Sequence, residues 1–300
     1  MNPDDITVGF VASLVANQFP QWSDLAITPV EHQGWDNRTF RLGTTMSVRL
    51  PSAEWYVAQV EKEHRWLPLL APQLPLVIPT PLVQVAPGAG FPFPWSVYTW
   101  IDGDLATDTS VDDDVTFARD LADFLLALHA IDTTDGPKAG TPSQRRGARV
   151  TIWDHQTRDT IADLGNAVDG VALLVAWDAA CTSEWSRPPV WVHGDVAPSN
   201  LLVRDGRLAA VLDFGCSAVG DPACDLVMAW TWFSGDSANE FRSRLDLDVD
   251  TWVRARGWAL WKALLVLAGP DPAADAARGG WRFSAAEVIN VILAEHRGNI

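Results

Sequence analysis

The sequence has few cysteines, few basic residues and no long apolar runs, and each shortage excludes a class of protein. Its three cysteines, Cys181, Cys216 and Cys224, have the spacing of neither a disulfide framework nor a zinc site. No apolar stretch reaches the length of a membrane span. The first residues lack the basic and apolar regions of a secretory signal. We therefore expect a soluble, cytoplasmic protein without a membrane partner.

The shortage of basic residues leaves a strong negative charge, which bears on possible partners. Lys and Arg number 22 against 38 Asp and Glu, a net charge of -16. Such a field repels nucleic acids and anionic membranes and attracts cationic ligands, although acidity also serves solubility alone. The apolar share of 48% and 16 tryptophans supply ample core. A chain of 300 residues fits two lobes that share a cleft.

The first hundred residues combine strand patterns with one helical pattern. Residues 39–42 and 46–50 read as strands joined by a turn at Gly43-Thr44-Thr45. Residues 57–70 have helical periodicity, with Pro68 near the end, where proline terminates or kinks a helix. We predict a small N-terminal lobe over residues 1–101, with an antiparallel sheet and one helix, and a hinge at about 98–104.

The remaining residues are mainly helical in pattern. Helical periodicity begins near 112, resumes over 151–184 and continues after Pro222. Short strands are expected at 190–192, 201–203 and 208–213, the last two joined by Asp205-Gly206, a strong hairpin signal. The predicted fold class is α+β, with a larger, mainly helical C-terminal lobe over residues 102–300.

One stretch between residues 193 and 225 holds the side chains that chemistry requires. It reads His193-Gly194-Asp195, then Asn200, then Asp213-Phe214-Gly215. A hairpin between Asn200 and Asp213 would bring an amide oxygen and a carboxylate together, and Mg²⁺ takes such oxygens alongside substrate phosphates. Asp195 would stay available to accept a hydroxyl proton. A positioned base and a charge-neutralising metal are what phosphoryl transfer needs.

This stretch resembles the aminoglycoside/macrolide phosphotransferase and choline-kinase-like group of the protein-kinase superfamily, over roughly residues 30–230. The His-Gly-Asp form of the loop points to the small-molecule branch. The resemblance implies a protein-kinase-like bilobal fold, with Asp195 as catalytic base and with Asn200 and Asp213 as Mg²⁺ ligands. It also implies three residues that support the catalytic loop: His193, Asp221 and Asp225.

The same resemblance implies a nucleotide site in the first lobe. The turn from Gly34 to Asn37 looks like the family's nucleotide-positioning loop. Arg49 stands where kinases usually place a phosphate-binding lysine, which is a departure because arginine is a bulkier, forked donor. Glu63 resembles the helix-borne glutamate that pairs with this cation, and Glu61 is the alternative.

The resemblance places purine contacts at the predicted hinge. The carbonyl of Thr99 and the amide of Ile101 would bind the purine edge. Because these are main-chain groups, they leave the co-substrate open between ATP and GTP.

The acceptor is the least readable part of the sequence. The resemblance implies transfer of a γ-phosphoryl group to a hydroxyl of an aminoglycoside-like compound, and antibiotic resistance is associated with the family name alone. One alternative is a macrolide as acceptor, because four tryptophans could line a pocket for it or for another bulky apolar hydroxyl compound. Others are an amino-alcohol metabolite as acceptor, or a catalytically silent, nucleotide-binding pseudokinase, favoured by Arg49. Carboxylates predicted to bind a cationic acceptor are Asp154, Asp159 and Glu295, with Asp163, Asp246 and Asp248 as further candidates; the tryptophans are Trp153, Trp177, Trp258 and Trp261.

Overall fold

The computed structural model describes residues 2–31 and 33–298, and the chain divides into two units. Unit 1 contains Met1–Gln73, Val77–Asp102 and Asp213–Gly215. Unit 2 contains Leu74–Leu76, Gly103–Leu212 and Cys216–Ile300. The segment Asp213–Gly215 therefore packs with unit 1, although it lies far beyond residue 101 in the sequence.

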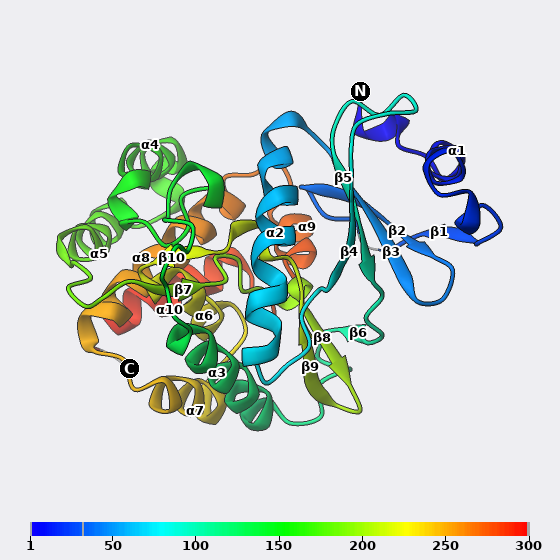
Figure 1. The fold of residues 1–300 in the computed structure, drawn as a ribbon. Helices are drawn as coiled ribbons and strands as arrows, with labels where there is room; N and C mark the ends of the chain where they lie inside the picture. The colour runs from blue at the N-terminus through cyan, green and yellow to red at the C-terminus, as the bar shows by residue number, and fades with distance from the viewer. Residues whose placement is uncertain (1, 32, 299–300) are drawn as a thin grey trace. The chain divides into compact units, whose positions relative to one another are not determined.

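Unit 1 is built on a five-stranded antiparallel sheet in the order β1-β2-β3-β5-β4. The register pairs Thr39 with Arg49 and Arg49 with Ser96, so three neighbouring strands are aligned at Arg49. The elements of unit 1 are α1 (Val8–Gln18), β1 (Ile27–Pro29), β2 (Asn37–Leu42), β3 (Met46–Pro51), α2 (Val57–Leu70), β4 (Pro81–Val85) and β5 (Trp95–Thr99) (Figure 1).

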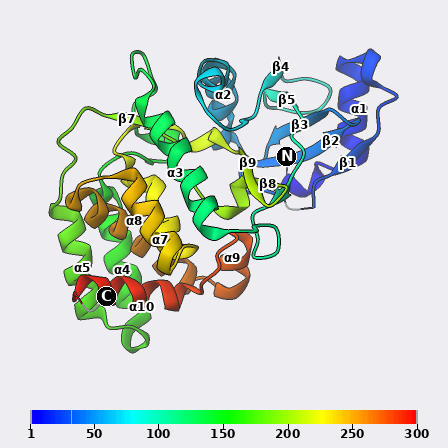
Figure 2. The same cartoon turned by 90° about the horizontal axis from the view of Figure 1, so that it is seen from below.

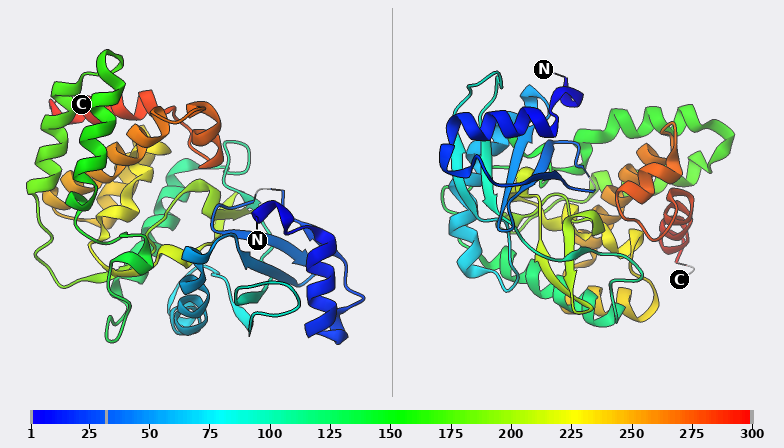
Figure 3. Two further views of the ribbon diagram at one scale, coloured as in Figure 1. Left: turned by 90° about the horizontal axis from the view of Figure 1, so that it is seen from above. Right: turned by 90° about the vertical axis from the view of Figure 1, so that its right-hand side faces the viewer.

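Alternation along the strands gives this sheet one apolar and one polar face. Phe40, Val48 and Val97 point to the apolar face, where they form a core with residues of α1. Figure 3 shows α1, in dark blue, lying across the strands. Arg49 and Tyr98 point to the opposite face, where both contact Glu63 of α2. The sheet therefore separates a purely apolar core from a charged layer under α2.

Unit 2 is mainly helical and is organised around α8. Asp248 caps this helix by accepting from the Thr251 amide, and α8 buries a stripe that includes Trp258. Figure 2 shows α3 and α7 side by side, and Figure 3 shows α4 and α5 as a pair. The helices of unit 2 are α3 (Asp114–Ala130), α4 (Asp154–Leu164), α5 (Gly170–Thr182), α6 (Met228–Thr231), α7 (Gly235–Leu245), α8 (Val249–Leu267), α9 (Pro272–Arg278) and α10 (Ala285–His296).

Short strands in unit 2 flank the stretch that begins at His193. The pair β7–β10 and the three-stranded sheet β6-β8-β9 are both antiparallel. The β8–β9 hairpin turns at Asp205-Gly206, and both turn residues have positive φ. The strands are β6 (Asp104–Leu105), β7 (Val190–Val192), β8 (Leu201–Arg204), β9 (Arg207–Val211) and β10 (Ala218–Gly220).

The predicted α+β fold class is confirmed, with an antiparallel sheet in unit 1 and a helical unit 2. The helix predicted over 57–70 is α2, and Pro68 lies inside its last turn rather than ending it. Gly269 and Pro270 lie between α8 and α9. Strands β1, β4, β6 and β10 were not predicted. Within the described residues, every helix is too short or too polar to span a bilayer.

Candidate active site

The backbone of the catalytic loop in unit 2 is held by one buried carboxylate. The amides of His193 and Gly194 donate to the two oxygens of Asp225 at 2.8 and 2.7 Å. Asp225 is fully buried, and burial raises the pKa of its carboxyl while these donors and the nearby His193 oppose the rise. These are the contacts expected of a residue that supports the loop.

The His193 ring joins the loop to the strand that follows. Its Nδ1 accepts from the Asp195 amide at 3.1 Å, and its Nε2 lies 2.8 Å from the Leu212 carbonyl oxygen. Because a carbonyl only accepts, Nε2 carries the proton and Nδ1 does not. Both ring nitrogens are used in holding the backbone, as expected of a support residue.

Gly194 is required by the shape of this loop. Its φ is +87°, and a Cβ atom there would lie 2.5 Å from the Cys216 carbonyl oxygen and 2.9 Å from the Cβ of Arg146. No larger residue fits without moving the backbone. The glycine brings Asp195, Cys216 and Arg146 into one small region of unit 2.

Asp195 is held by two neighbours, one at its carboxylate and one at its main chain. Lys262 of α8 donates to its Oδ1 at 2.9 Å, and the side-chain amide of Asn200 donates to its main-chain oxygen at 2.9 Å. Burial by itself would raise the pKa of Asp195, but the positive charges of Lys262 and Arg146 outweigh burial and hold the pKa well below its usual range. The side chain is 37% exposed, so an ionised carboxylate remains accessible.

Asp221 anchors the segment that follows the motif. Its Oδ2 accepts from Arg254 Nε at 2.7 Å, and its Oδ1 caps the next turn through the Ala223 amide. Both members of the ion pair are buried. Asp221 thus ties this turn to α8, the helix that carries Lys262.

Unit 1 brings Arg49 and Glu63 together. Arg49 Nη1 lies 3.3 Å from both Glu63 oxygens, and Tyr98 donates its hydroxyl to Glu63 Oε2 at 2.5 Å. Burial would lower the pKa of Arg49, but the carboxylates of Glu63 and Asp213 raise it further above its usual range. The competing residue Glu61 is exposed on α2, whereas Glu63 is buried. Arg49 therefore makes the pairing with Glu63 expected of the kinase lysine.

Asp213 lies at a strained position in the same network. Its φ of +60° is unusual for a residue other than glycine, and such strain concentrates at functional sites. Its Oδ1 accepts from Gly215 N at 3.2 Å and lies 3.4 Å from Arg49 Nη2. Lys62 donates to the Gly215 carbonyl, so α2 and β3 each contribute one contact to the segment.

The predicted Mg²⁺ ligands, Asn200 and Asp213, each offer oxygen atoms that suit this ion. Asn200 directs its Nδ2 to Asp195, which leaves Oδ1 without a donor among the described residues. Asp213 is 31% exposed and offers carboxylate oxygens. An amide oxygen and a carboxylate match the preference of Mg²⁺ for a few protein oxygens plus phosphates. No cluster of three His, Cys, Asp or Glu was found among the described residues, so a full protein cage is not formed there.

The loop predicted to position the nucleotide is held by side chains on both sides. Gln59 of α2 donates to Asp36 at 2.8 Å, and Asn37 is buried at the start of β2. A Cβ atom on Gly34 would meet nothing closer than 4.0 Å, so protein packing does not demand a glycine there. The space beside Gly34 is therefore open, and its contact with a nucleotide stays a prediction.

The predicted hinge residues follow β5. The Thr99 amide donates to the Thr80 carbonyl and the Trp100 amide to the Thr45 carbonyl. Among the described residues, no acceptor is found for the Ile101 amide. Ile101 is thus available as a donor to a purine edge, the role that the sequence predicts.

The three carboxylates predicted for a cationic acceptor already have partners. Asp154 accepts from Arg158 at 2.8 Å and from Trp177 at 2.7 Å. Asp159 pairs with His155 at 2.5 Å on an exposed surface. Glu295 accepts from Arg242 at 2.6 Å and Trp230 at 2.9 Å, and lies 3.5 Å from Arg256. An acceptor ammonium would have to compete with these cations.

Two residues near Asp195 were missed by the sequence analysis. Lys262 and Arg146 come from α8 and from the loop before α4, far from the motif in sequence. A signal for Lys262 was present, because it is the sole charged residue between Arg256 and the end of α8 at Leu267. Arg146 lies in a polar loop that gave no comparable signal.

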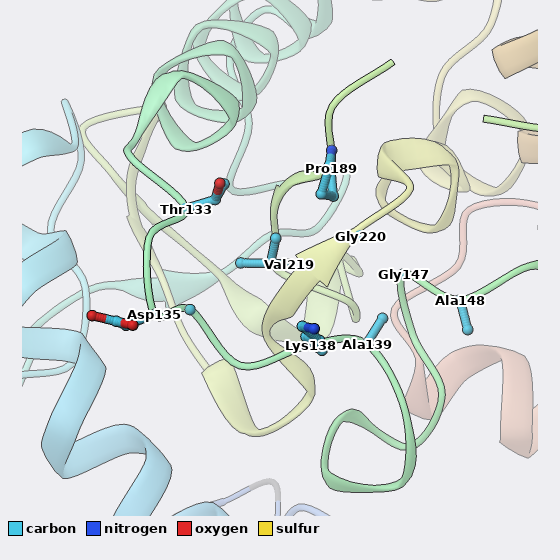
Figure 4. A pocket seen from close by; sticks show the side chains of 10 residues that line it. Thr133, Asp135, Lys138, Ala139, Gly147, Ala148, Pro189, Val219 and Gly220 are labelled. Carbon is cyan, nitrogen blue, oxygen red and sulfur yellow. The ribbon is translucent and has the colours of Figure 1, made fainter. Parts of the chain in front are cut away.

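A separate hollow of about 560 Å³ opens elsewhere in unit 2. Figure 4 shows it lined by main chain and small side chains, with Asp135 and Lys138 as its charged residues. None of the predicted site residues lines it.

Solved structures of phosphotransferases have the same fold. The structure resembles the GDP complex of a mutant of aminoglycoside 2'-phosphotransferase-IIIa (TM-score 0.72, 18% identity, 98% of each chain). It also resembles the GDP and kanamycin complex of APH(2")-IIIa (0.71, 19%, 98% of this chain and 100% of that chain). Macrolide 2'-phosphotransferase MphH from Brachybacterium faecium matches at 0.63, 22% and 96% of each chain.

Sequence comparison finds a curated relative and a family. The uncharacterised protein YcbJ of Bacillus subtilis (strain 168) is 28% identical over 163 residues, 53% of this chain and 50% of that protein. This chain therefore spans about half the length of the curated relative that it matches. The model of the phosphotransferase enzyme family APH matches residues 27–258, most of the chain. The chain belongs to the phosphotransferase enzyme family, whose members transfer phosphoryl groups from nucleotides to hydroxyl acceptors.

Proposed function

We propose that this protein transfers the γ-phosphoryl group of ATP or GTP to a hydroxyl group of a small molecule. The observation that carries the proposal is the state of Asp195: an ionised, partly exposed carboxylate fixed at the turn of a loop braced by His193 and Asp225. A base for phosphoryl transfer needs this combination of accessibility and fixed geometry.

In the proposed reaction, Asp195 accepts a hydrogen bond from the acceptor hydroxyl and then its proton. The hydroxyl oxygen forms a bond to the γ-phosphorus, the bond from that phosphorus to the β–γ bridging oxygen breaks, and the nucleoside diphosphate leaves. Because phosphoryl transfer passes through a loose transition state, a weak base suffices and orientation matters most. The low pKa of Asp195 is compatible with this role.

The nucleotide would be bound by the residues of unit 1. Arg49, held by Glu63, would contact the phosphates, and the Ile101 amide would donate to the purine. Bound Mg²⁺, for which Asp213 and Asn200 are the proposed ligands, neutralises phosphate charge during transfer. The GDP and ADP complexes of structural relatives support a nucleotide co-substrate.

An aminoglycoside-like acceptor stays a proposal. It is supported by the net charge of -16 and by the kanamycin and streptomycin complexes of structural relatives. The likeness to MphH supports a macrolide in the same way. The ion pairs of Asp154 and Glu295 weigh against these two as ligands of an ammonium group.

The test is an assay of nucleoside diphosphate release, with ATP or GTP and Mg²⁺, against kanamycin, a macrolide, choline and homoserine. Asp195→Asn should lower kcat by about 10²–10⁴-fold, with Mg²⁺–ATP binding by calorimetry unchanged. Asp205→Asn is the matched control, because Asp205 has positive φ in the β8–β9 turn and asparagine tolerates this conformation.

Full turnover by Asp195→Asn would contradict the role of this residue. Absence of Mg²⁺–ATP and Mg²⁺–GTP binding at millimolar concentration would contradict the proposed function. Nucleotide binding without release of nucleoside diphosphate for any acceptor would favour the catalytically silent pseudokinase.

A further inference from the structure

Two cations of unit 2 face the single carboxylate of Asp195. Lys262 contacts it directly at 2.9 Å. Arg146 lies close to the same loop, since its Cβ is 2.9 Å from where a Cβ on Gly194 would be, and its positive charge lowers the pKa of Asp195. Two positive charges therefore act on the proposed base, while Asp225, the other carboxylate of the loop, is bound to the amides of His193 and Gly194.

Arg146 is fixed in place by aromatic rings rather than by carboxylates. Its guanidinium carbon lies 4.7 Å from the ring centroid of Trp261 and 5.6 Å from that of Trp258. Its Nε is buried and has no hydrogen-bond partner within the described part of the chain. A buried donor without a partner costs free energy, so this guanidinium has unused capacity to bind a ligand.

Lys262 also keeps unused donors. An ammonium group has three N–H bonds, and Asp195 is its one hydrogen-bond partner among the described residues. The side chain is 15% exposed, so α8 holds the ammonium group at the edge of the protein interior. The residue before Lys262 in α8 is Trp261, whose ring contacts the guanidinium of Arg146.

We propose that Arg146 and Lys262 form an oxyanion-binding site beside Asp195, which takes a phosphoryl or carboxylate group during the reaction. This inference rests on the proposed function and adds two residues to it. The forked guanidinium suits two oxygens of such a group, and the ammonium supplies a third contact. Lys262 also positions Asp195 by holding Oδ1, while Oδ2, which accepts a long hydrogen bond of 3.4 Å from Asn200 Nδ2, has a further lone pair for the acceptor hydroxyl.

Two sources of the oxyanion share this chemistry. One is the phosphoryl group in transfer, whose charge the two cations would stabilise. The other is an acidic group of the acceptor, which would make the substrate a hydroxy acid or a phosphorylated alcohol. Binding of a simple anion tests the site, and turnover distinguishes the sources.

The first experiment measures binding of inorganic phosphate by calorimetry at low ionic strength to the full chain. We expect Arg146→Gln and Lys262→Met to weaken binding by about tenfold or more, because each removes a charged donor. Lys262→Arg should retain most of it. The control is Arg145→Gln, since Arg145 is the exposed neighbour whose guanidinium lies over Trp153.

Equal phosphate affinity in the wild type, Arg146→Gln and Lys262→Met would overturn the site, and so would the absence of phosphate binding by the wild type. Thermal melting checks that each variant folds. If Arg146→Gln fails to fold, Arg146→Lys, which keeps the charge but loses the fork, replaces it and should show a smaller loss of phosphate affinity.

The second experiment measures hydrolysis of Mg²⁺–ATP with water as acceptor. A fall in kcat of about tenfold or more in both variants, with KM for ATP unchanged, assigns the site to the transferred phosphoryl group. Unchanged hydrolysis with weakened phosphate binding assigns it to an acidic acceptor, and hydroxy acids should then outperform their amides as acceptors. Phosphate binding by a protein that binds neither Mg²⁺–ATP nor Mg²⁺–GTP would refute the proposed function and leave the anion site standing.

Discussion

Arg254 and Asp221 form an ion pair that is almost wholly buried, with side chains 2% and 7% exposed and Nε 2.7 Å from Oδ2. The pair is completed by Thr251 and Ser183, which accept from the two Nη atoms of Arg254 at 3.0 Å. A buried pair gives stability only when its hydrogen bonds are satisfied, as they are here. It connects α8 to the turn after β10.

Arg254→Met should lower the free energy of unfolding of the protein by about 3–5 kcal/mol, because it leaves the Asp221 carboxylate buried without its partner. Urea denaturation would measure the loss. Arg278→Met is the control, because its pair with Asp275 is exposed and should contribute less than about 1 kcal/mol. The double variant Arg254→Met with Asp221→Asn should be more stable than Arg254→Met alone. Similar losses for Arg254→Met and Arg278→Met would contradict the assigned importance of burial.

Gly194→Ala should destabilise the protein by about 2–4 kcal/mol and lower turnover, because the new methyl group strikes Cys216 and displaces Asp195. Gly165→Ala separates the two causes. Gly165 also has positive φ, but a Cβ there would meet nothing within 4 Å, so only the strain of the backbone remains and no side-chain clash is added. Equal effects of the two variants on stability and activity would show that the contact with Cys216 is unimportant.

Arg49→Lys should raise KM for ATP by roughly three- to thirtyfold, because a lysine cannot contact Glu63 and Asp213 through two separate nitrogens. Steady-state kinetics at saturating acceptor would measure it, and KM for the acceptor should not change. Arg65→Lys, an exposed position of α2, is the control. A KM for ATP equal to that of the wild type would show that the forked geometry of Arg49 is dispensable.

The buried side chain of His129 should make the folded protein less stable in mild acid. Burial lowers the pKa of its imidazole from 6.5 to about 4, and its Nε2 is buried without a partner among the described residues. The folded state therefore binds the proton less tightly than the unfolded state, so stability is full above pH 6.5 and is lost as the pH falls towards 4. The expected loss is on the order of 2 kcal/mol.

Urea denaturation at pH 7.5 and 4.5 would measure this loss, and His129→Gln should reduce the difference between the two values. His155→Gln, at an exposed position, should leave the difference as in the wild type. If His129→Gln and the wild type lost the same free energy between the two values, the assignment to His129 would be refuted.

Local sequence patterns were sufficient to predict elements that depend on residues close together in the chain. The periodicity of 57–70 gave α2 with its observed bounds, and Asp205-Gly206 gave the β8–β9 hairpin. The motif gave Asp195 and its neighbours because they follow one another along a loop. Lys262 and Arg146 were not found, because their proximity to Asp195 depends on how helices pack and not on spacing.

Pairing of the predicted acceptor carboxylates could not be foreseen for the same reason. Asp154 has one partner within α4, the Arg158 that lies four residues away, and another on α5. Glu295 of α10 meets Arg242 of α7 and Arg256 of α8. A lone carboxylate in a sequence looks the same whether or not tertiary packing later supplies a cation.

The inclusion of Asp213–Gly215 in unit 1 affects how the protein is made. A ribosome releases the strands and α2 of unit 1 long before residue 215 of 300 exists. Until then Lys62 lacks the Gly215 carbonyl and Arg49 lacks Asp213, so the charged layer of unit 1 stays incomplete during synthesis. Nucleotide binding by unit 1 should therefore mature late in translation, and a chain released after residue 102 should not acquire it.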